Sequence, residues 1–170
     1  ESDSEQGLRT LRRWAHSKQN HDALALVEAL GIYTCFNLLL FDPDTTLHSL
    51  RENVRFMQRA STLPFNFGRV ELYAGTPLLS RMQQEGRAVG DYLQWDYPLA
   101  SAAVERVFTM TMAAFRERNF GADALANRVM GLRFDIEVCR HFHPECFQKK
   151  KKKEGLRITR ELSEDSVSAL

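Results

Sequence analysis

The feature that most constrains the fold is an unbroken apolar run, IYTCFNLLLF, which follows Gly31 and ends just before Asp42-Pro43. Its length and its β-branched and aromatic content predict a buried strand, of the kind that a parallel sheet contains. The turn DPDTT comes next, and Asp44 or Thr45 within it can cap a helix over about residues 46–60. The apolar positions of that helix recur at helical spacing: Leu47, Leu50, Val54 and Met57.

The same order then occurs a second time. After the loop STLPFNFG, the sequence predicts a strand over about residues 68–73, and a helix follows Pro77 and ends near Gly86. Two further helices are expected upstream, over about residues 3–16 and 22–30. Strands that alternate with helices predict an α/β fold with a parallel sheet. Two parallel strands need cover on both faces and both edges, so we expect further strands upstream of Glu1, in a longer protein.

The second half of the chain has a different character. A polar and aromatic loop, RAVGDYLQWDYPLA, precedes two long helices expected over about residues 100–119 and 122–142. From residue 148 onward a run of lysines leads into a mixed-charge stretch with little apolar content, which predicts a disordered tail. The expected organisation is therefore an α/β part over residues 1–86, a helical extension over residues 87–147 and a basic tail over residues 148–170.

Composition excludes several classes of partner. The chain has 23 basic and 22 acidic residues and a net charge of +1, so it has no overall bias toward nucleic acid or an anionic membrane surface. Its longest apolar run is far shorter than the roughly 18 residues of a membrane-spanning helix. Three cysteines argue against a disulfide framework and for a reducing compartment. We therefore expect a cytoplasmic protein that binds neither nucleic acid nor a membrane.

Both predicted strands end in turns with special chemistry, and ligands of α/β sheets bind at the carboxyl ends of the strands. Within the phrase YAGTPL, Gly75 permits a positive φ or a close approach of the backbone. Thr76 can cap the next helix, and Pro77 suits its first position. Such turns also occur in α/β folds that bind nothing there, so the turn alone does not establish a ligand site.

The order of these phrases resembles the second half of the radical S-adenosylmethionine enzymes. FNLLLFDPDTT stands where that family has a strand with a Pro-Gly-Glu-Thr-like turn, and VELYAGTPL where the next strand has a Pro-Gly-Thr-Pro-like turn. ESDSEQGLRTLRR and HDALALVEALGI look like the end of the fourth strand and the helix after it. GDYLQWDY, FRERNF and ANRVMGLRFDIEVCRHFHP are similar to the subset with an N-terminal cobalamin-binding domain. The resemblance covers about residues 1–144.

The resemblance implies the C-terminal part of a partial (β/α)6 TIM-like barrel, with about two parallel strands here, followed by a mainly α-helical extension. The family's Cys-x3-Cys-x2-Cys is absent, because Cys35, Cys139 and Cys146 have another spacing. The ligands of a [4Fe–4S] cluster would therefore lie outside this chain, and so would any cobalamin domain. The implied enzyme reductively cleaves S-adenosylmethionine to a 5′-deoxyadenosyl radical, for methyl transfer or rearrangement of an unidentified small molecule. This fragment alone would be inactive and would need the upstream part of the same polypeptide.

The resemblance also implies which residues bind the cofactor. The backbone at the end of the second strand would meet the adenine, the Gly-Thr-Pro turn would admit the nucleoside, and the first residue would lie near the polar end of the ligand. The candidates for S-adenosylmethionine binding are Glu1, Asn37, Leu39, Leu72, Tyr73, Gly75 and Thr76. Weaker candidates for a substrate wall are Tyr92, Trp95 and Tyr97. The phrase CRHFHPEC is interpreted as a helix end rather than a metal site, because structural zinc usually needs two separated ligand pairs.

A function of a different class is also open. The chain can be a non-catalytic, mainly helical protein-interaction module, in which the α/β part is a scaffold and the run Lys149–Lys153 contacts a partner. The gene upstream of Glu1 distinguishes the two, since a Cys-x3-Cys-x2-Cys about a hundred residues away favours the enzyme.

Overall fold

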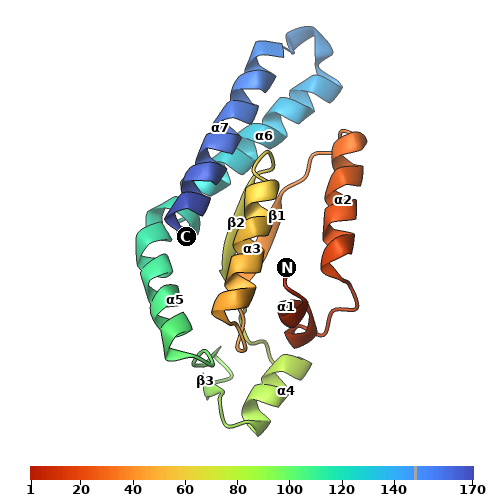
Figure 1. Ribbon diagram of the computed structural model, residues 1–170. Helices are drawn as coiled ribbons and strands as arrows, with labels where there is room; N and C mark the ends of the chain where they lie inside the picture. Colours follow the sequence, from red (N-terminus) through yellow and green to blue (C-terminus); the bar gives the residue numbers. More distant parts are fainter. Residues whose placement is uncertain (148) are drawn as a thin grey trace.

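A pair of parallel strands lies at the centre of the computed structural model, which describes residues 1–147 and 149–170 (Figure 1). β1 (Phe36–Phe41) and β2 (Phe65–Arg69) pair in parallel, with Phe36 opposite Phe65 and a register shift between Leu39 and Phe41. The predicted strand began too early, since residues 32–35 of the apolar run lie outside β1 and Ile32 is 54% exposed. The connection between them is α3 (Leu47–Arg59). The expected α/β class with parallel pairing is therefore confirmed for this part of the chain.

The two faces of this sheet have different surroundings. Leu38 and Phe67 point to one face and are buried in the core that α3 and α5 (Ala102–Phe115) help to form. On the other face Asn37 is exposed and Leu39 is half-buried. Buried parallel sheets normally have helices on both faces. In this chain the helical cover is on one face, and the opposite face is more open.

The second strand begins and ends earlier than the sequence predicted. The prediction of a strand over residues 68–73 was wrong. Strand pairing already begins at the buried, alternating Phe65 and Phe67, which lie in the segment expected to be a loop. Val70 still donates its backbone N–H to the carbonyl of Phe41 at 2.8 Å. Leu72 then leaves the sheet and forms an antiparallel bridge with Trp95.

Two helices occupy the N-terminal part, and their predicted ranges were also wrong. α1 (Glu5–Thr10) ends early because the backbone turns at Arg12, which has a left-handed φ of 52°. α2 (Ser17–Ala29) begins earlier than expected, and the side-chain oxygen of Gln19 accepts a hydrogen bond from the backbone N–H of His16 at 2.7 Å at its start. Nothing in α2 is fully buried, which fits its position at the side of the molecule (Figure 1).

The turn that follows the second strand was predicted well. Gly75 has a φ of 78°, Thr76 caps α4 (Pro77–Gln84), and Pro77 is at its start. The predicted N-cap of α3 was wrong, since the hydroxyl of Thr46, and not a side chain of Asp44 or Thr45, accepts a hydrogen bond from a backbone N–H of the first turn. The expected loop after Gly86 contains an antiparallel hairpin of β3 (Val89–Asp91) and β4 (Gln94–Asp96).

The rest of the chain is helical. A π-helix (Arg116–Phe120) continues α5, then α6 (Leu125–Phe142), a 3-10 turn (Pro144–Cys146) and α7 (Lys149–Ala169) follow. Figure 1 shows α6 and α7 side by side, reaching away from the sheet at the end opposite α4. Among the described residues, no helix combines the length and the apolar character that crossing a membrane requires.

The expected disorder after residue 148 was wrong for the residues that the structure describes; residue 148 itself lies outside them. α7 packs on α6 through small side chains: Gly155, Thr159, Ser163 and Ser166 are buried. A Cβ on Gly155 would lie 2.5 Å from Cδ1 of Ile136, so its absence allows the close approach. These residues carry little hydrophobicity, and for that reason the sequence pattern did not predict an ordered helix.

Candidate functional site

A cavity of about 520 Å³ lies at the carboxyl ends of β1 and β2. This volume is within the usual range of small-molecule sites. The end of α1, the strand ends and the turn into α4 surround it, and its lining residues are Glu1, Thr10, Leu11, Arg12, Arg13, Leu39, Arg69, Val70, Glu71, Tyr73, Thr76, Pro77 and Leu78. The cavity is therefore at the edge of the sheet where an α/β fold binds its ligands.

Four of the predicted cofactor residues come together there. Glu1, Leu39, Tyr73 and Thr76 all line the cavity, although they come from three separate parts of the sequence. The backbone N–H of Leu39 donates to the carbonyl of Glu1, so the first residue lies at the free edge of β1. The Thr76 hydroxyl donates to the carbonyl of Tyr73 at 2.7 Å and thereby fixes the turn at the cavity rim.

The other three predicted cofactor residues lie outside the lining. Asn37 is exposed, two residues before Leu39 on the open face of the sheet. Leu72 is buried in the core and bridges to Trp95. Gly75 is exposed, and a Cβ built on it would meet no atom within 4 Å, so its positive φ and not a close contact explains the glycine.

The three aromatic candidates for a substrate wall are not part of this cavity. Tyr92 is 82% exposed at the tip of the β3–β4 hairpin, whereas Trp95 packs against the core. Tyr97 is buried, and its hydroxyl donates to the carbonyl of Val70 at 2.7 Å. Burial raises the pKa of Tyr97, which keeps the phenol neutral. In this structure Tyr97 supports the end of the second strand.

Sequence reasoning identified Glu1 but missed the other charged residues of the cavity, among them Arg13 and Arg69. Arg13 forms an ion pair with Glu1, whose hydrogen bond raises the pKa of Arg13. The guanidinium of Arg69 lies 4.1 Å from the ring centre of Tyr97, and its Nη2 is 3.1 Å from a carboxylate oxygen of Asp96. The available signal was positional, since Arg12 and Arg13 come two and three residues after α1, and Arg69 is the last residue of β2.

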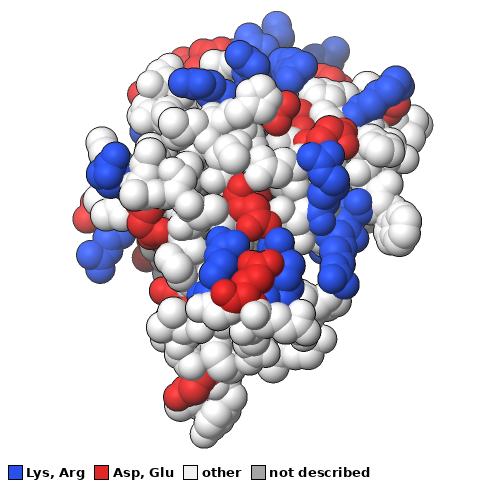
Figure 2. Space-filling view, turned by 60° about the horizontal axis from the view of Figure 1, so that its bottom comes forward, with Lys and Arg blue, Asp and Glu red and all other residues white. Residues whose placement is uncertain are grey.

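Below the strand ends, two aspartates of the turn after β1 have opposite electrostatics. Burial raises the pKa of Asp42. Burial acts on Asp44 in the same direction, but hydrogen bonds from Arg81 and Arg87 outweigh it and lower the pKa of Asp44. Figure 2 shows acidic side chains flanked by basic ones on this end of the molecule. The charges here largely neutralise one another.

The chemistry of the lining fits S-adenosylmethionine better than it fits an iron–sulfur cluster. A nucleoside with a zwitterionic tail needs apolar surface together with charges of both signs, and Leu39, Val70, Glu1 and Arg12 provide these. Among the residues that the structure describes, no cysteine lines the cavity, and Cys35 and Cys139 are free and exposed elsewhere. Within the described part of the chain, no group of three or more His, Cys, Asp or Glu side chains is arranged to hold a metal ion.

Comparisons with known proteins bear on the fold. No protein-family model and no curated protein matches this sequence. Two solved structures of the cobalamin-dependent S-adenosylmethionine radical enzyme OxsB match its fold. One, with aqua-cobalamin and S-adenosylmethionine bound, has a TM-score of 0.64 at 18% identity; the other, with aqua-cobalamin bound, has a TM-score of 0.63 at 16% identity. Each match covers 98% of this chain but 28% of the OxsB chain, so the chain spans little more than a quarter of that enzyme's length. At this identity the likeness shows a shared fold.

Proposed function

We propose that this chain is the C-terminal part of the barrel and the helical extension of a radical S-adenosylmethionine enzyme, of the subset that binds cobalamin. The observation that carries the proposal is the cavity at the carboxyl ends of two parallel strands, lined by four residues assigned beforehand to the cofactor. The fold shared with OxsB over 98% of the chain supports it. The reductive cleavage to a 5′-deoxyadenosyl radical is the chemistry that the cofactors would supply.

The residues of the chain would bind and orient S-adenosylmethionine. Leu39 and Val70 offer apolar surface at the strand ends, and Tyr73 and Thr76 form the rim beside the turn into α4. Glu1 lines the cavity together with the charged side chains of the α1 end, where the polar tail of the ligand would be neutralised. Enclosure by these side chains would also exclude water from the reacting centre.

The chain would act together with the upstream part of its polypeptide. The [4Fe–4S] ligands and a cobalamin domain would come from there, because the described cysteines are far from a cluster motif in spacing. Additional strands would extend the sheet beyond Glu1 and enclose its open face, which completes a partial barrel. Tyr92 is exposed on the hairpin outside the cavity lining, so it would contact a substrate only beyond the cofactor pocket. Methyl transfer and rearrangement are the proposed reaction types.

The test uses the complete polypeptide, reconstituted with iron and sulfide without oxygen and given S-adenosylmethionine and a strong reductant. We expect 5′-deoxyadenosine by mass spectrometry. Replacing Leu39 with Trp should fill the cavity and reduce the product at least about tenfold, the loss expected when a ligand is misplaced in its site. Met110→Trp is the control, because Met110 is 71% exposed on α5. No product from a protein with an intact cluster would refute the enzyme, and an unimpaired Leu39→Trp variant would refute the pocket.

A further inference from the structure

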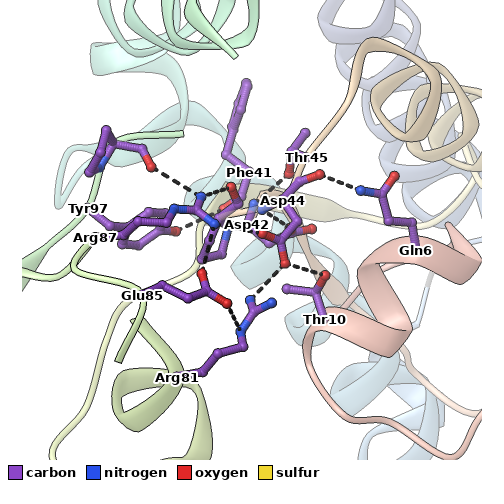
Figure 3. Close-up of polar contacts among 12 residues, drawn as sticks. Gln6, Thr10, Phe41, Asp42, Asp44, Thr45, Arg81, Glu85, Arg87 and Tyr97 are labelled. Carbon is purple, nitrogen blue, oxygen red and sulfur yellow. Dashed lines mark hydrogen bonds and ion pairs between the residues drawn. The ribbon is translucent and has the colours of Figure 1, made fainter. Parts of the chain in front are cut away.

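Asp44, in the turn after β1, is bonded to α1 and to the α4 segment, which both contribute residues to the cavity lining, but Asp44 itself is not part of that lining. Its carboxylate accepts hydrogen bonds from the hydroxyl of Thr10 at 3.1 Å, from Nη2 of Arg81 at 2.7 Å and from Nη1 of Arg87 at 2.9 Å. Figure 3 shows these side chains converging on Asp44 from separate elements. Three charge-assisted bonds on one carboxylate make a strong, directional junction.

On one side this junction holds α1. Thr10 is the last residue of that helix and lines the cavity, so its bond to Asp44 fixes the helix end that forms a cavity wall. The side chain of Gln6, one turn earlier, donates to the backbone carbonyl of Asp44. Two bonds from successive turns of a six-residue helix fix both its position and its rotation.

On the other side the junction holds α4. Arg81 lies one turn beyond Pro77, and Pro77 lines the cavity together with its neighbours Thr76 and Leu78. Arg87 follows the same helix and reaches back to the carbonyl of Pro43, next to Asp44 in the turn. α4 is a short helix attached by a glycine-containing turn, so these bonds fix where its first turn lies.

We propose that Asp44 is a positioning residue that sets the separation between α1 and the first turn of α4, and thereby the width of the cavity. The ligand itself would not touch Asp44, because Asp44 is absent from the lining. The side chains of Asp44, Arg81 and Arg87 are 24%, 30% and 24% exposed, so solvent screens their charges only in part. This inference rests on the proposed function for the identity of the ligand, but not for the mechanical role of Asp44.

The test compares Asp44→Asn and Arg81→Met with the wild type in the complete polypeptide. Asp22→Asn is the matched control, since Asp22 pairs with Lys18 at 2.6 Å on the exposed surface of α2 and is remote from the cavity lining. Amide hydrogen exchange is measured over residues 5–13 and 73–84, with α6 and α7 as internal reference. Binding of S-adenosylhomocysteine and the kcat and KM for 5′-deoxyadenosine formation are measured on the same proteins.

We expect both variants to exchange about tenfold faster in the two wall segments, with the reference helices and the control unchanged. S-adenosylhomocysteine should bind about tenfold more weakly, and KM for S-adenosylmethionine should rise while kcat is largely kept. If Asp44 only stabilised the whole fold, its substitution would accelerate exchange in every helix and leave the KM of the folded fraction unchanged. That result would overturn the proposal. Unchanged exchange in both walls would overturn it as well.

Failure of the proposed function gives a different result. If the wild type binds no S-adenosylhomocysteine and forms no product, the cofactor assignment falls. The exchange data still decide the role of Asp44, because faster exchange confined to the two walls supports the junction whatever the cavity binds.

Discussion

The region around the strand ends and the α6–α7 hairpin are held together by different means. At the strand ends, directed hydrogen bonds and ion pairs meet at polar groups such as Asp44 and Asn53. In the hairpin, small residues such as Gly155 let two helices approach closely, and the buried Arg133 donates to the Thr159 hydroxyl at 3.3 Å. A region that surrounds a cavity cannot fill its interior with side chains, so its walls are fixed by polar contacts from outside. The α6–α7 hairpin borders only a small void of about 10 Å³, so close packing can hold its two helices together.

The largest effect is expected where both regions depend on the same core. The ring centre of Phe67 on β2 lies 5.2 Å from that of Phe115 and 5.7 Å from that of Phe120. Phe67 thereby joins the sheet to the helical part. Phe67→Ala should lower the free energy of unfolding by about 3–5 kcal/mol, measured by urea denaturation. Its control is Phe142→Ala, since Phe142 is 67% exposed. Equal losses in the two variants would mean that Phe67 does not join the regions.

Asn53 offers a way to weaken the strand-end region alone. Its side-chain oxygen accepts from the backbone N–H of Asp3 at 2.7 Å and from the Ser2 hydroxyl at 3.2 Å, and all three residues are buried. Asn53→Leu leaves these donors unpaired and should cost about 1–3 kcal/mol of stability. Hydrogen exchange should accelerate in α1 before it does in α7. The exposed Gln58→Leu on the same helix is the control, and a similar loss there would rule out this explanation.

Two glycine-to-alanine substitutions compare the regions directly. Gly75→Ala should cost about 1–2 kcal/mol because its φ is 78°, with no steric clash. Gly155→Ala should cost about 1–3 kcal/mol because the new methyl group meets Ile136. Adding Ile136→Ala should make the Gly155 substitution less costly and leave the cost of the Gly75 substitution unchanged, as measured by thermal denaturation. Coupling of Ile136 to Gly75 instead would contradict the distinction.

The two aspartates of the β1 turn should respond to acid in opposite ways. The pKa of Asp42 is raised in the folded state, so the folded state gains relative stability as pH falls through that pKa. The pKa of Asp44 is lowered, so its contribution is complete above the ordinary value of about 3.9 and is lost as pH falls through the lower folded pKa. Carboxyl carbon NMR should show Asp42 protonating first on acidification. The reverse order would show that the arginines do not hold Asp44 ionised.

The smallest effect is expected outside both regions. Asp22→Asn removes an ion pair whose side chains are 83% and 61% exposed, and should change stability by less than about 0.5 kcal/mol. A larger loss would show that α2 contributes more to the fold than its exposure indicates.

Those features that depend on a few neighbouring residues could be predicted from the sequence. The positive φ of Gly75 and the cap at Thr76 follow from local backbone chemistry, and the apolar run over residues 32–41 predicts that a strand exists there, although β1 occupies only its second part. The register of β2 could not be predicted from the sequence, because Phe65 and Phe67 become part of a strand by pairing with residues about thirty positions earlier. That α7 is an ordered helix could not be predicted either, since its small buried residues stabilise it only by packing on α6.

The candidate site divides in the same way. The sequence by itself determined that two strands end in turns suited to a ligand, and the resemblance assigned Glu1, Leu39, Tyr73 and Thr76 to one cofactor. The tertiary structure alone decided that these four line one cavity, that Tyr97 is buried beneath the strand end, and that Asp44 joins α1 to α4 through Arg81. The physical reason is the distance along the chain over which each kind of interaction acts. Turn and cap preferences act over a few residues, whereas a cavity and its ion pairs exist only once distant segments are packed together.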